Sequence, residues 1–510
     1  MQASQRSALR IVNRLRIIRP MSEPTRRVLA LAPMPPEKSA YALARYSRSP
    51  DSIEESLRWV HAHSAEKFWE QFYFAYGHAS IADLGHVIVC FEHISELAAI
   101  RLEDEPLWDG QAKSSRYQNF APSGCFAPDA ILGTETEGTY RGILGSLFNA
   151  YALLHDPLKK FLSERAPKPE SMKPGDYERT IAARAFDVTR YLLPLAARTN
   201  VGQVVSIRTL EKQIVRLLSS PLPELRAIGE ELKETCRRPP VNVWGELGGD
   251  RTAPEPLAPT LARYANPSAY QQNVYTELSR YAKPLLKRAG LDATPAASDT
   301  VELIEPHDPM DELAATLLYR VSHAPYRRIL EVVRSWSAKE KQDLIDIGLK
   351  GRGGPDELIR EFRSGYALIF DILMDIGGWR DMHRHRRCQQ IQQSFTTLHG
   401  YDIPPALTEA GLARDYCAAM DAVRSDIDRL RGSNQEAALY AIPFGFKVRC
   451  LFKMDYAEAE YMSRLRSGVK GHWSYRQVAW QMKQQLAKRY PYLADQIKAT
   501  PPDVEDSLAR

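Results

Sequence analysis

The most informative segment of this 510-residue chain reads Trp379-Arg-Asp-Met-His383-Arg384-His385-Arg386-Arg387-Cys388-Gln-Gln-Ile-Gln-Gln-Ser394. One arginine on each side of a histidine brings two fixed positive charges and one titratable ring close together. This arrangement suits the binding of a pyrophosphate. An Arg-rich helix that faces solvent and pairs with nearby carboxylates has the same charge pattern. Charge alone therefore leaves an anion-binding site and a solvated surface helix as alternatives.

The chain around this segment contains an internal repeat. Four pairs of segments occur in the same order: Arg45-Tyr-Ser47-Arg-Ser-Pro50 with Arg320-Val-Ser322-His-Ala-Pro325, the apolar 86–94 with 367–376, Thr189–Pro194 with Ala438–Pro443, and the amphipathic helical patterns Ile207–Leu218 with Tyr456–Leu465. The repeat predicts an α+β fold with two tandem copies of one domain, each with an antiparallel or mixed sheet packed against long helices.

The domain boundaries follow from the repeat and from local composition. We expect a basic extension at 1–27, a first copy at 28–240, a linker rich in Pro, Ala, Gly and Tyr at 241–300, a second copy at 301–495 and a tail at 496–510. The extension holds seven arginines and one acidic residue, so it accounts for the net charge of +5. Three explanations fit it: a targeting presequence, a basic arm, or sequence upstream of a true start at Met21. The rest is close to neutral, so no specific nucleic-acid binding is predicted.

Composition excludes several other classes of protein. The chain is 44% hydrophobic and 26% charged, as in ordinary globular proteins. No apolar run approaches the roughly 18 residues of a membrane helix, so no membrane partner is expected. Six scattered cysteines without a CxxC pair exclude a disulfide scaffold or zinc ribbon and favour a reducing cytoplasm. We predict no metal, because the histidines lack ligand partners at helical spacing. Cys388 is either a buried, inert thiol or a nucleophile activated by the preceding arginines.

The spacing Arg384-His385-Arg386-x7-Ser394 resembles the signature of the flavin-dependent thymidylate synthases. Other elements of that family occur in the family's order: Gly77-His78-Ala-Ser80, Ser114-Ser115-Arg116-Tyr117 and Arg190-Tyr-Leu-Leu-Pro194 in the first copy, then Arg320-Val-Ser322 and Arg466 in the second. The resemblance covers about 28–236 and 301–491. It implies an FAD enzyme that reductively methylates dUMP to dTMP, with methylenetetrahydrofolate and NADPH as co-substrates.

Each copy departs from the family pattern in a complementary way. In the first copy, Asp104-Glu105-Pro106 stand at the Arg-His-Arg position and Leu217 at the position of the family's catalytic arginine. In the second copy, Leu439 stands where the first has Arg190, and the loop reads Gln392-Gln-Ser-Phe-Thr396. Family members build each site from neighbouring subunits of a tetramer. We therefore infer one composite site formed by both copies, a dead opposite site, and a homodimer that imitates the tetramer; the composite site lies either within one chain or across the dimer.

The resemblance also implies residue roles at the composite site. Arg466 is the expected catalytic residue, and it stabilises the anionic uracil ring. The residues expected to bind FAD are Arg384, His385, Arg386, Ser322, His78, Ser80 and Arg208. The residues expected to bind dUMP are Ser114, Ser115, Arg116, Arg190, Asp381, Arg384 and Arg466.

Three departures near this site leave the substrate open. Asp381 stands near a family Gln that touches the nucleotide, Tyr461 replaces an Asn, and Gln392 replaces a frequent Glu. Two alternatives therefore remain: FAD-dependent modification of another pyrimidine nucleotide, and a non-catalytic descendant that binds nucleotides or RNA.

Overall fold

The computed structural model describes residues 31, 34–47, 49, 52–75, 79–241, 255–292, 299–304, 309–352, 359–362, 368–495, 497–506 and 508. The basic extension and His78 lie outside these residues, as does the side chain of Ser80. Within the described part of the chain, no helix is both long enough and apolar enough to cross a membrane.

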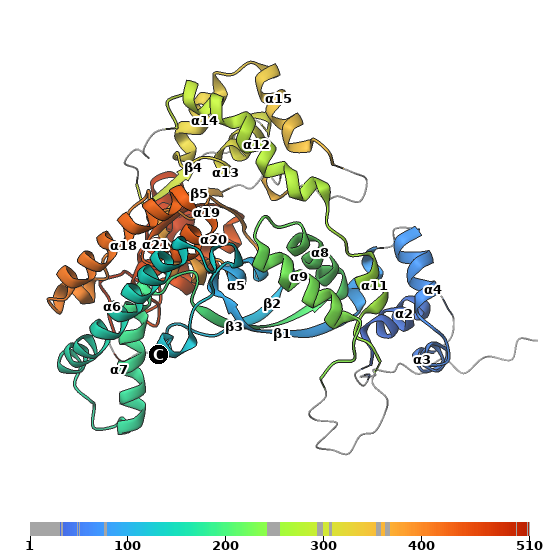
Figure 1. Cartoon of the computed structure of the whole chain (residues 1–510), viewed down its shortest axis with the longest axis horizontal. Helices are drawn as coiled ribbons and strands as arrows, with labels where there is room; N and C mark the ends of the chain where they lie inside the picture. The colour runs from blue at the N-terminus through green and yellow to red at the C-terminus, as the bar shows by residue number, and fades with distance from the viewer. Residues whose placement is uncertain are drawn as a thin grey trace, which may run out of the picture.

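The first copy is built on a three-stranded antiparallel sheet in the order β1-β3-β2 (Figure 1). Its strands are β1 (His86–Ser95), β2 (Asp109–Ala112) and β3 (Arg198–Ser206). Residues alternate between exposed and buried from His86 to Phe91, so one face of β1 is open to solvent. The buried face packs in one hydrophobic cluster with α8 (Ile207–Leu218) and α9 (Pro223–Cys236). The elements before β1 are α2 (Pro36–Tyr46), α3 (Ile53–His61), α4 (Glu66–Phe68), η2 (Trp69–Ala75) and η3 (Ala79–Leu84).

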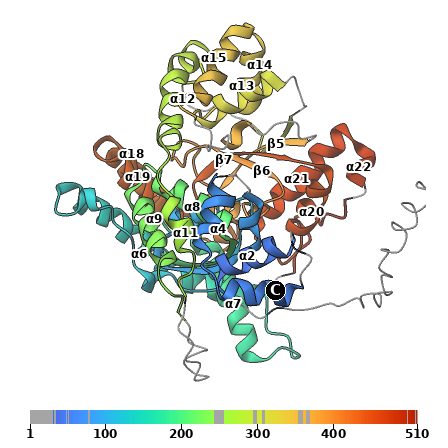
Figure 2. The ribbon, with the colours of Figure 1, turned by 90° about the vertical axis from the view of Figure 1, so that its right-hand side faces the viewer.

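The second copy is built on a four-stranded antiparallel sheet in the order β4-β5-β7-β6. Its strands are β4 (Val301–Ile304), β5 (Leu368–Asp375), β6 (Gln389–Gln392) and β7 (Lys447–Met454). Both faces of β5 and β7 are buried. One face lies against a group of helices at one end of the molecule (Figure 2): α12 (Ala269–Arg288), α13 (Pro309–Arg320), α14 (Tyr326–Arg334) and α15 (Ala338–Leu349). The helices after β7 are α20 (Tyr456–Arg466), α21 (Trp473–Arg489) and α22 (Pro491–Asp495).

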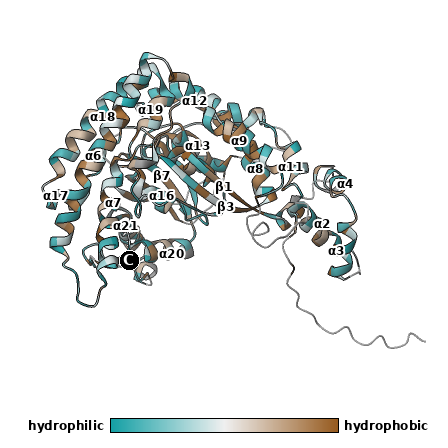
Figure 3. Cartoon of the chain, turned by 60° about the horizontal axis from the view of Figure 1, so that its bottom comes forward, coloured by the Kyte–Doolittle hydropathy of each residue, from teal (hydrophilic) through white to brown (hydrophobic). Residues whose placement is uncertain are grey.

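Long paired helices complete both copies. The helices of the first copy are α5 (Glu96–Leu102), α6 (Glu135–Arg165) and α7 (Pro174–Thr189), with short turns η4 (Ala121–Ser123), η5 (Asp129–Ile131) and η6 (Arg190–Leu192). Those of the second are α16 (Ile376–Met382), α17 (Pro405–Glu409), α18 (Ala413–Ser433) and α19 (Gln435–Ala441), with η7 (Arg360–Phe362). Along α6 and α18 hydrophilic and hydrophobic residues interleave (Figure 3), and the apolar stripe of each packs into a core shared by the two copies.

Matched local signals start matched helices in the two copies. Ser95 caps α5 by accepting a hydrogen bond from the third following amide, and Asp375 caps α16 in the same way. Ser206 and Asp455 do the same for α8 and α20. The helical patterns expected at Ile207–Leu218 and Tyr456–Leu465 are therefore confirmed, the second with one more residue at its end.

The two copies are joined about an approximate twofold axis. Pro194 and Pro443 form an antiparallel bridge at the junction. Four main-chain hydrogen bonds cross it in matched pairs, from the amides of Leu195, Ala196, Phe444 and Gly445 to the carbonyls of Ile442, Tyr440, Leu193 and Tyr191, respectively. The predicted α+β fold of two tandem copies is thus confirmed, and these main-chain contacts at the junction recur with the copies exchanged.

The segment expected as a linker contains two helices among its described residues. α11 (Pro259–Tyr264) packs with the first copy, and α12 packs with the helices of the second. The Tyr270 hydroxyl at the start of α12 donates a hydrogen bond to the Gly348 carbonyl at 2.9 Å.

Candidate active site

The Asp381 carboxylate on α16, whose side chain is 15% exposed, lies in the positive field of four arginines from both copies. Arg190, which is 2% exposed, donates from Nη2 to Asp381 Oδ2 at 3.2 Å. Burial alone would raise the pKa of Asp381, but the positive charges of Arg190, Arg116, Arg384 and Arg466 lower it below its ordinary value. Arg116 and Arg190 belong to the first copy, whereas Arg384 and Arg466 belong to the second. A single chain therefore brings both predicted half-sites together.

Asp187, on the last turn of α7, organises the first-copy half of the site. It accepts hydrogen bonds from Arg116 Nε at 2.8 Å and Nη2 at 3.3 Å, and lies 3.3 Å from Arg190 Nε. His472 Nδ1, at the start of α21 in the second copy, lies 2.9 Å from Asp187 Oδ2. Burial would raise the pKa of Asp187, but His472, Arg116 and Arg190 hold it well below its ordinary value. The sequence interpretation missed Asp187, although its place three residues before Arg190 on a helix was a signal.

Arg116 also reaches the second copy. Its Nη1 donates to the Tyr475 hydroxyl at 3.3 Å, and its Nη2 lies 3.5 Å from the Lys470 carbonyl. Ser114 Oγ accepts a hydrogen bond from the Arg116 amide at 3.3 Å, and Ser115 is buried beside it in the chain. The loop after β2 thus presents its arginine at the junction between the copies.

Glu458, His385 and Arg466 form a hydrogen-bonded relay in the second copy. Arg466 Nε donates to His385 Nε2 at 2.8 Å, and because arginine cannot accept, the ring proton lies on Nδ1. That proton is donated to Glu458 Oε1 at 2.9 Å. Burial, with the charge of Arg466, lowers the pKa of His385 below its ordinary value despite Glu458. A neutral histidine therefore orients Arg466, whose Nη atoms have no hydrogen-bond partner within the described residues.

Arg384 and Arg386 lie against β2 of the first copy with weak partners. Arg384 Nη1 is 3.4 Å from Gln111 Oε1. Arg386 Nη1 is 3.6 Å from Asp109, whose side chain is 91% exposed, and its guanidinium lies 4.5 Å from the centre of the Trp108 ring. Arg384 acts on Asp381 only through its field, and among the described residues neither Arg384 nor Arg386 forms a hydrogen bond or ion pair with a buried carboxylate, so both can receive an anion.

The structure does not join the remaining predicted residues to this cluster. Arg208 donates to Asp83 at 2.8 Å near the start of α8. Ser322 is buried and bonds within the turn after α13. Cys388 is also buried; its thiol donates to the His385 carbonyl at 3.0 Å, and burial raises its pKa, which disfavours a nucleophilic thiolate. The roles assigned to Arg208 and Ser322, like those of the residues in the cluster, stay predictions.

A family model described as thymidylate synthase complementing protein matches residues 29–239 and 359–492, which is more than half of the chain. The chain belongs to this family. The resemblance seen in the Arg-His-Arg spacing and in the order of the other elements is therefore confirmed.

Curated relatives align with most of both copies. A UPF0159 protein of Chlamydia muridarum is 25% identical over 439 residues, which is 84% of this chain and 79% of the relative. One from Chlamydia pneumoniae is 26% identical over 443 residues, with the same coverage. One from Thermoplasma acidophilum is 23% identical over 497 residues, which is 89% of this chain and 94% of the relative.

Two similar solved structures are of the flavin-dependent thymidylate synthase ThyX from Helicobacter pylori with FAD and dUMP. The first is 15% identical to this chain, with a TM-score of 0.25, and the second is 17% identical, with a TM-score of 0.24. Each alignment covers 39% of this chain, together with 89% of the first solved chain and 88% of the second. These scores are too low to locate a ligand in this chain.

Proposed function

We propose that this chain is an FAD-dependent thymidylate synthase with one active site per chain, built by both copies. It converts dUMP to dTMP with methylenetetrahydrofolate as the one-carbon donor and NADPH as the reductant. The observation that carries the proposal is the set of four arginines, two from each copy, around Asp381. Family membership supports the reaction class.

The charge at the site suits a nucleoside monophosphate. Three guanidiniums, those of Arg116, Arg190 and Arg466, face the carboxylates of Asp187 and Asp381, which leaves one positive charge in excess when Arg384 is left for the cofactor. A phosphate monoester carries about −1.5 to −2 at neutral pH, so this positive excess favours its binding. Arg116 and Arg190 hold the 5′-phosphate, each through charged hydrogen bonds worth about 1.5–3 kcal/mol.

The residues at β2 fit the anionic part of FAD. Arg384 and Arg386 flank His385 in the sequence, and neither is paired with a buried carboxylate in the part of the chain that the structure describes, so a pyrophosphate supplies the charge that they lack. When bound, FAD supplies the hydride that the pyrimidine ring receives.

Arg466 stabilises the negative charge that develops on the uracil ring. Its Nε is fixed by His385, and its Nη atoms are left to donate to the N3 and O2 edge of the base. His385 is a positioning residue, because its Nε2 already accepts the Arg466 hydrogen bond and its Nδ1 proton goes to Glu458.

A second candidate is the modification of another pyrimidine nucleotide by the same site. Asp381 favours it, because a carboxylate can accept a hydrogen bond from an exocyclic amino group, which uracil lacks. Assays with dCMP and UMP beside dUMP distinguish the two candidates.

The decisive experiment combines cofactor binding, product formation and complementation. Purified protein should bind FAD, form dTMP from dUMP and rescue a thymidine-requiring strain. Arg116→Gln and Arg384→Gln should each abolish activity although they lie in different copies. Arg141→Gln is the matched control, because Arg141 is exposed on α6 and forms an ion pair with Glu137 at 2.6 Å within the same helix. Colourless protein that binds no FAD would contradict the proposal, and retention of RNA without NADPH oxidation would favour a non-catalytic descendant.

A further inference from the structure

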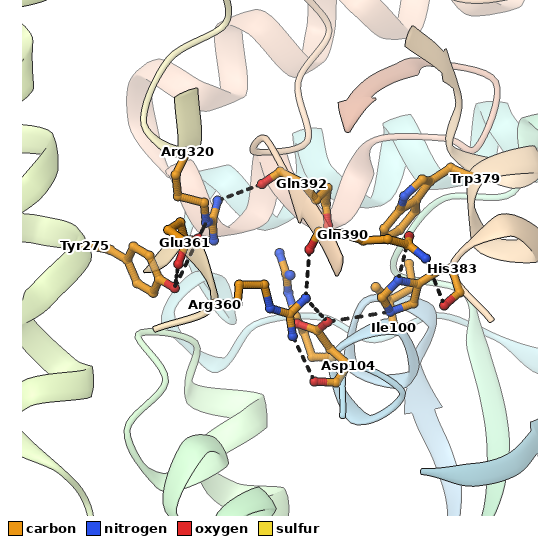
Figure 4. A pocket seen from close by; sticks show the side chains of 11 residues that line it. Ile100, Asp104, Tyr275, Arg320, Arg360, Glu361, Trp379, His383, Gln390 and Gln392 are labelled. Atoms are coloured by element: carbon orange, nitrogen blue, oxygen red, sulfur yellow. Dashed lines mark hydrogen bonds and ion pairs between the residues drawn. The ribbon is translucent and has the colours of Figure 1, made fainter. Parts of the chain in front are cut away.

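A charged cavity lies between the two copies, at the position that corresponds to the predicted cofactor-phosphate site when the copies are exchanged (Figure 4). Asp104 is the first-copy match of Arg384. Arg384 lies against Gln111 on β2, and Asp104 in turn lies near Gln390 on β6, where both residues line the cavity. The cavity is therefore the twofold counterpart of the predicted cofactor-phosphate position.

This cavity contains more positive than negative charge, although the matched arginine is lost. Arg101, Arg320 and Arg360 line it together with the carboxylates of Asp104 and Glu361. Arg360 Nη1 lies 2.6 Å from Asp104, and Arg320 Nε lies 3.3 Å from Glu361. In Figure 4, dashed lines join Asp104 to Arg360 and to His383. Two of the three guanidiniums are thus neutralised, and Arg101 is left over.

Arg101 makes no hydrogen bond or ion pair with any described residue. Its guanidinium lies 5.9 Å from the centre of the Phe395 ring. Burial, with the like charges of Arg320, Arg216 and Arg360, lowers the pKa of Arg101 to about 10, against the pull of Asp104. A charge in this position is costly unless an anion joins it.

His383 lines the same cavity beside Asp104. Its side chain is 10% exposed, and its Nε2, which makes no hydrogen bond among the described residues, lies 3.7 Å from Asp104 Oδ1. The Gln390 amide nitrogen donates to the Met382 and His385 carbonyls, so Gln390 Oε1 is the acceptor for His383 Nδ1 at 3.3 Å.

We propose that this counterpart cavity binds a phosphate-class oxyanion at the Arg101 guanidinium. Phosphate oxygens accept hydrogen bonds from Arg101 and supply the negative charge that this guanidinium lacks. The cavity volume is about 50 Å³. One water needs about 10–15 Å³, so the space suits one phosphate group but not a whole nucleotide. The anion is either free phosphate or the phosphate of a larger molecule that extends out of the cavity.

The test titrates inorganic phosphate into the full chain at constant ionic strength and follows thermal stabilisation. The starting protein carries Arg116→Gln, so that phosphate binding at the active site is weakened. We expect saturable stabilisation, and an increase in Kd of about tenfold or more when Arg101→Gln is added, because one charged hydrogen bond is worth about 1.5–3 kcal/mol. Loss of the stabilisation with Arg116→Gln alone, or a Kd that Arg101→Gln leaves unchanged, would overturn the proposal.

Two further measurements complete the design. A crystal of the unaltered chain grown in phosphate does not depend on how a variant folds: density for an anion beside the Arg101 guanidinium supports the site, and an empty cavity refutes it. A parallel titration with a nucleoside monophosphate in the same Arg116→Gln protein identifies the source. If the nucleoside monophosphate binds more tightly than inorganic phosphate and Arg101→Gln abolishes this binding, the anion is the phosphate of a larger molecule. If it binds more weakly, the anion is free phosphate. Neither result depends on thymidylate synthase activity.

Discussion

Arg116→Gln tests whether the first copy contributes to a site whose other half belongs to the second. In the structure, Nε and Nη2 of Arg116 are engaged by Asp187, and Nη1 has only the Tyr475 hydroxyl at 3.3 Å. At least one charged hydrogen bond is therefore available to a phosphate, and its loss costs about 1.5–3 kcal/mol. The Kd for dUMP should increase roughly 10- to 150-fold.

The same variant should fold. Asp187 keeps Arg190 and His472 as partners, so its carboxylate is not left uncompensated, and the loss in free energy of unfolding should stay below the roughly 3–5 kcal/mol of a fully broken buried pair. Calorimetric titration with dUMP measures Kd, and urea unfolding measures stability. A Kd within about threefold of the unaltered protein, in a variant that unfolds normally, would refute the assignment of Arg116 to the phosphate.

Three more predictions follow from the site. Mixing Arg116→Gln with Arg384→Gln chains should restore no activity, because one chain contains both halves; recovered activity in the mixture would place the site across two chains. Asp187→Asn should reduce the free energy of unfolding by about 3–5 kcal/mol at neutral pH. Because the pKa of Asp187 is depressed in the folded state, the ionised carboxylate stabilises the fold above about pH 4, and this stabilisation is lost as the pH falls further. The difference in urea unfolding between the variant and the unaltered protein should therefore shrink at about pH 3. The acid limb of the pH profile of kcat should lie below pH 6.5, because protonation of His385 there displaces Arg466. Glu458→Gln removes a charge that raises the pKa of His385, so this limb should move to lower pH. A limb that does not move would exclude His385 as the group that titrates there.

Local patterns were sufficient to predict most of the fold. The caps at Ser206 and Asp455 and the periodicity behind them act within one turn, so α8 and α20 could be placed from sequence. The strands expected at 86–94 and 367–376 occur as β1 and β5 within one residue at each end. Helix α12 is harder to predict, because Pro284 interrupts it, although its buried residues recur every four positions from Tyr270.

The partners at the site depend on packing between distant segments, which sequence spacing does not show. Asp187 looks like one more polar residue on α7 until α21 brings His472 to it. Asp104 looks like a simple loss of the Arg-His-Arg motif, whereas the structure gives it Arg360 as a new partner from the other copy. Pairs of this kind are fixed by the twofold junction at Pro194 and Pro443, which no local pattern encodes.

The central claim is that two partly degenerate copies form one complete site within each chain. The measurement that tests it most directly is the number of FAD molecules bound per chain at saturation. The structure predicts one, because only one half of the molecule combines Arg384, Arg386 and Arg466 with Arg116 and Arg190. Two FAD molecules per chain, or none, would contradict the claim.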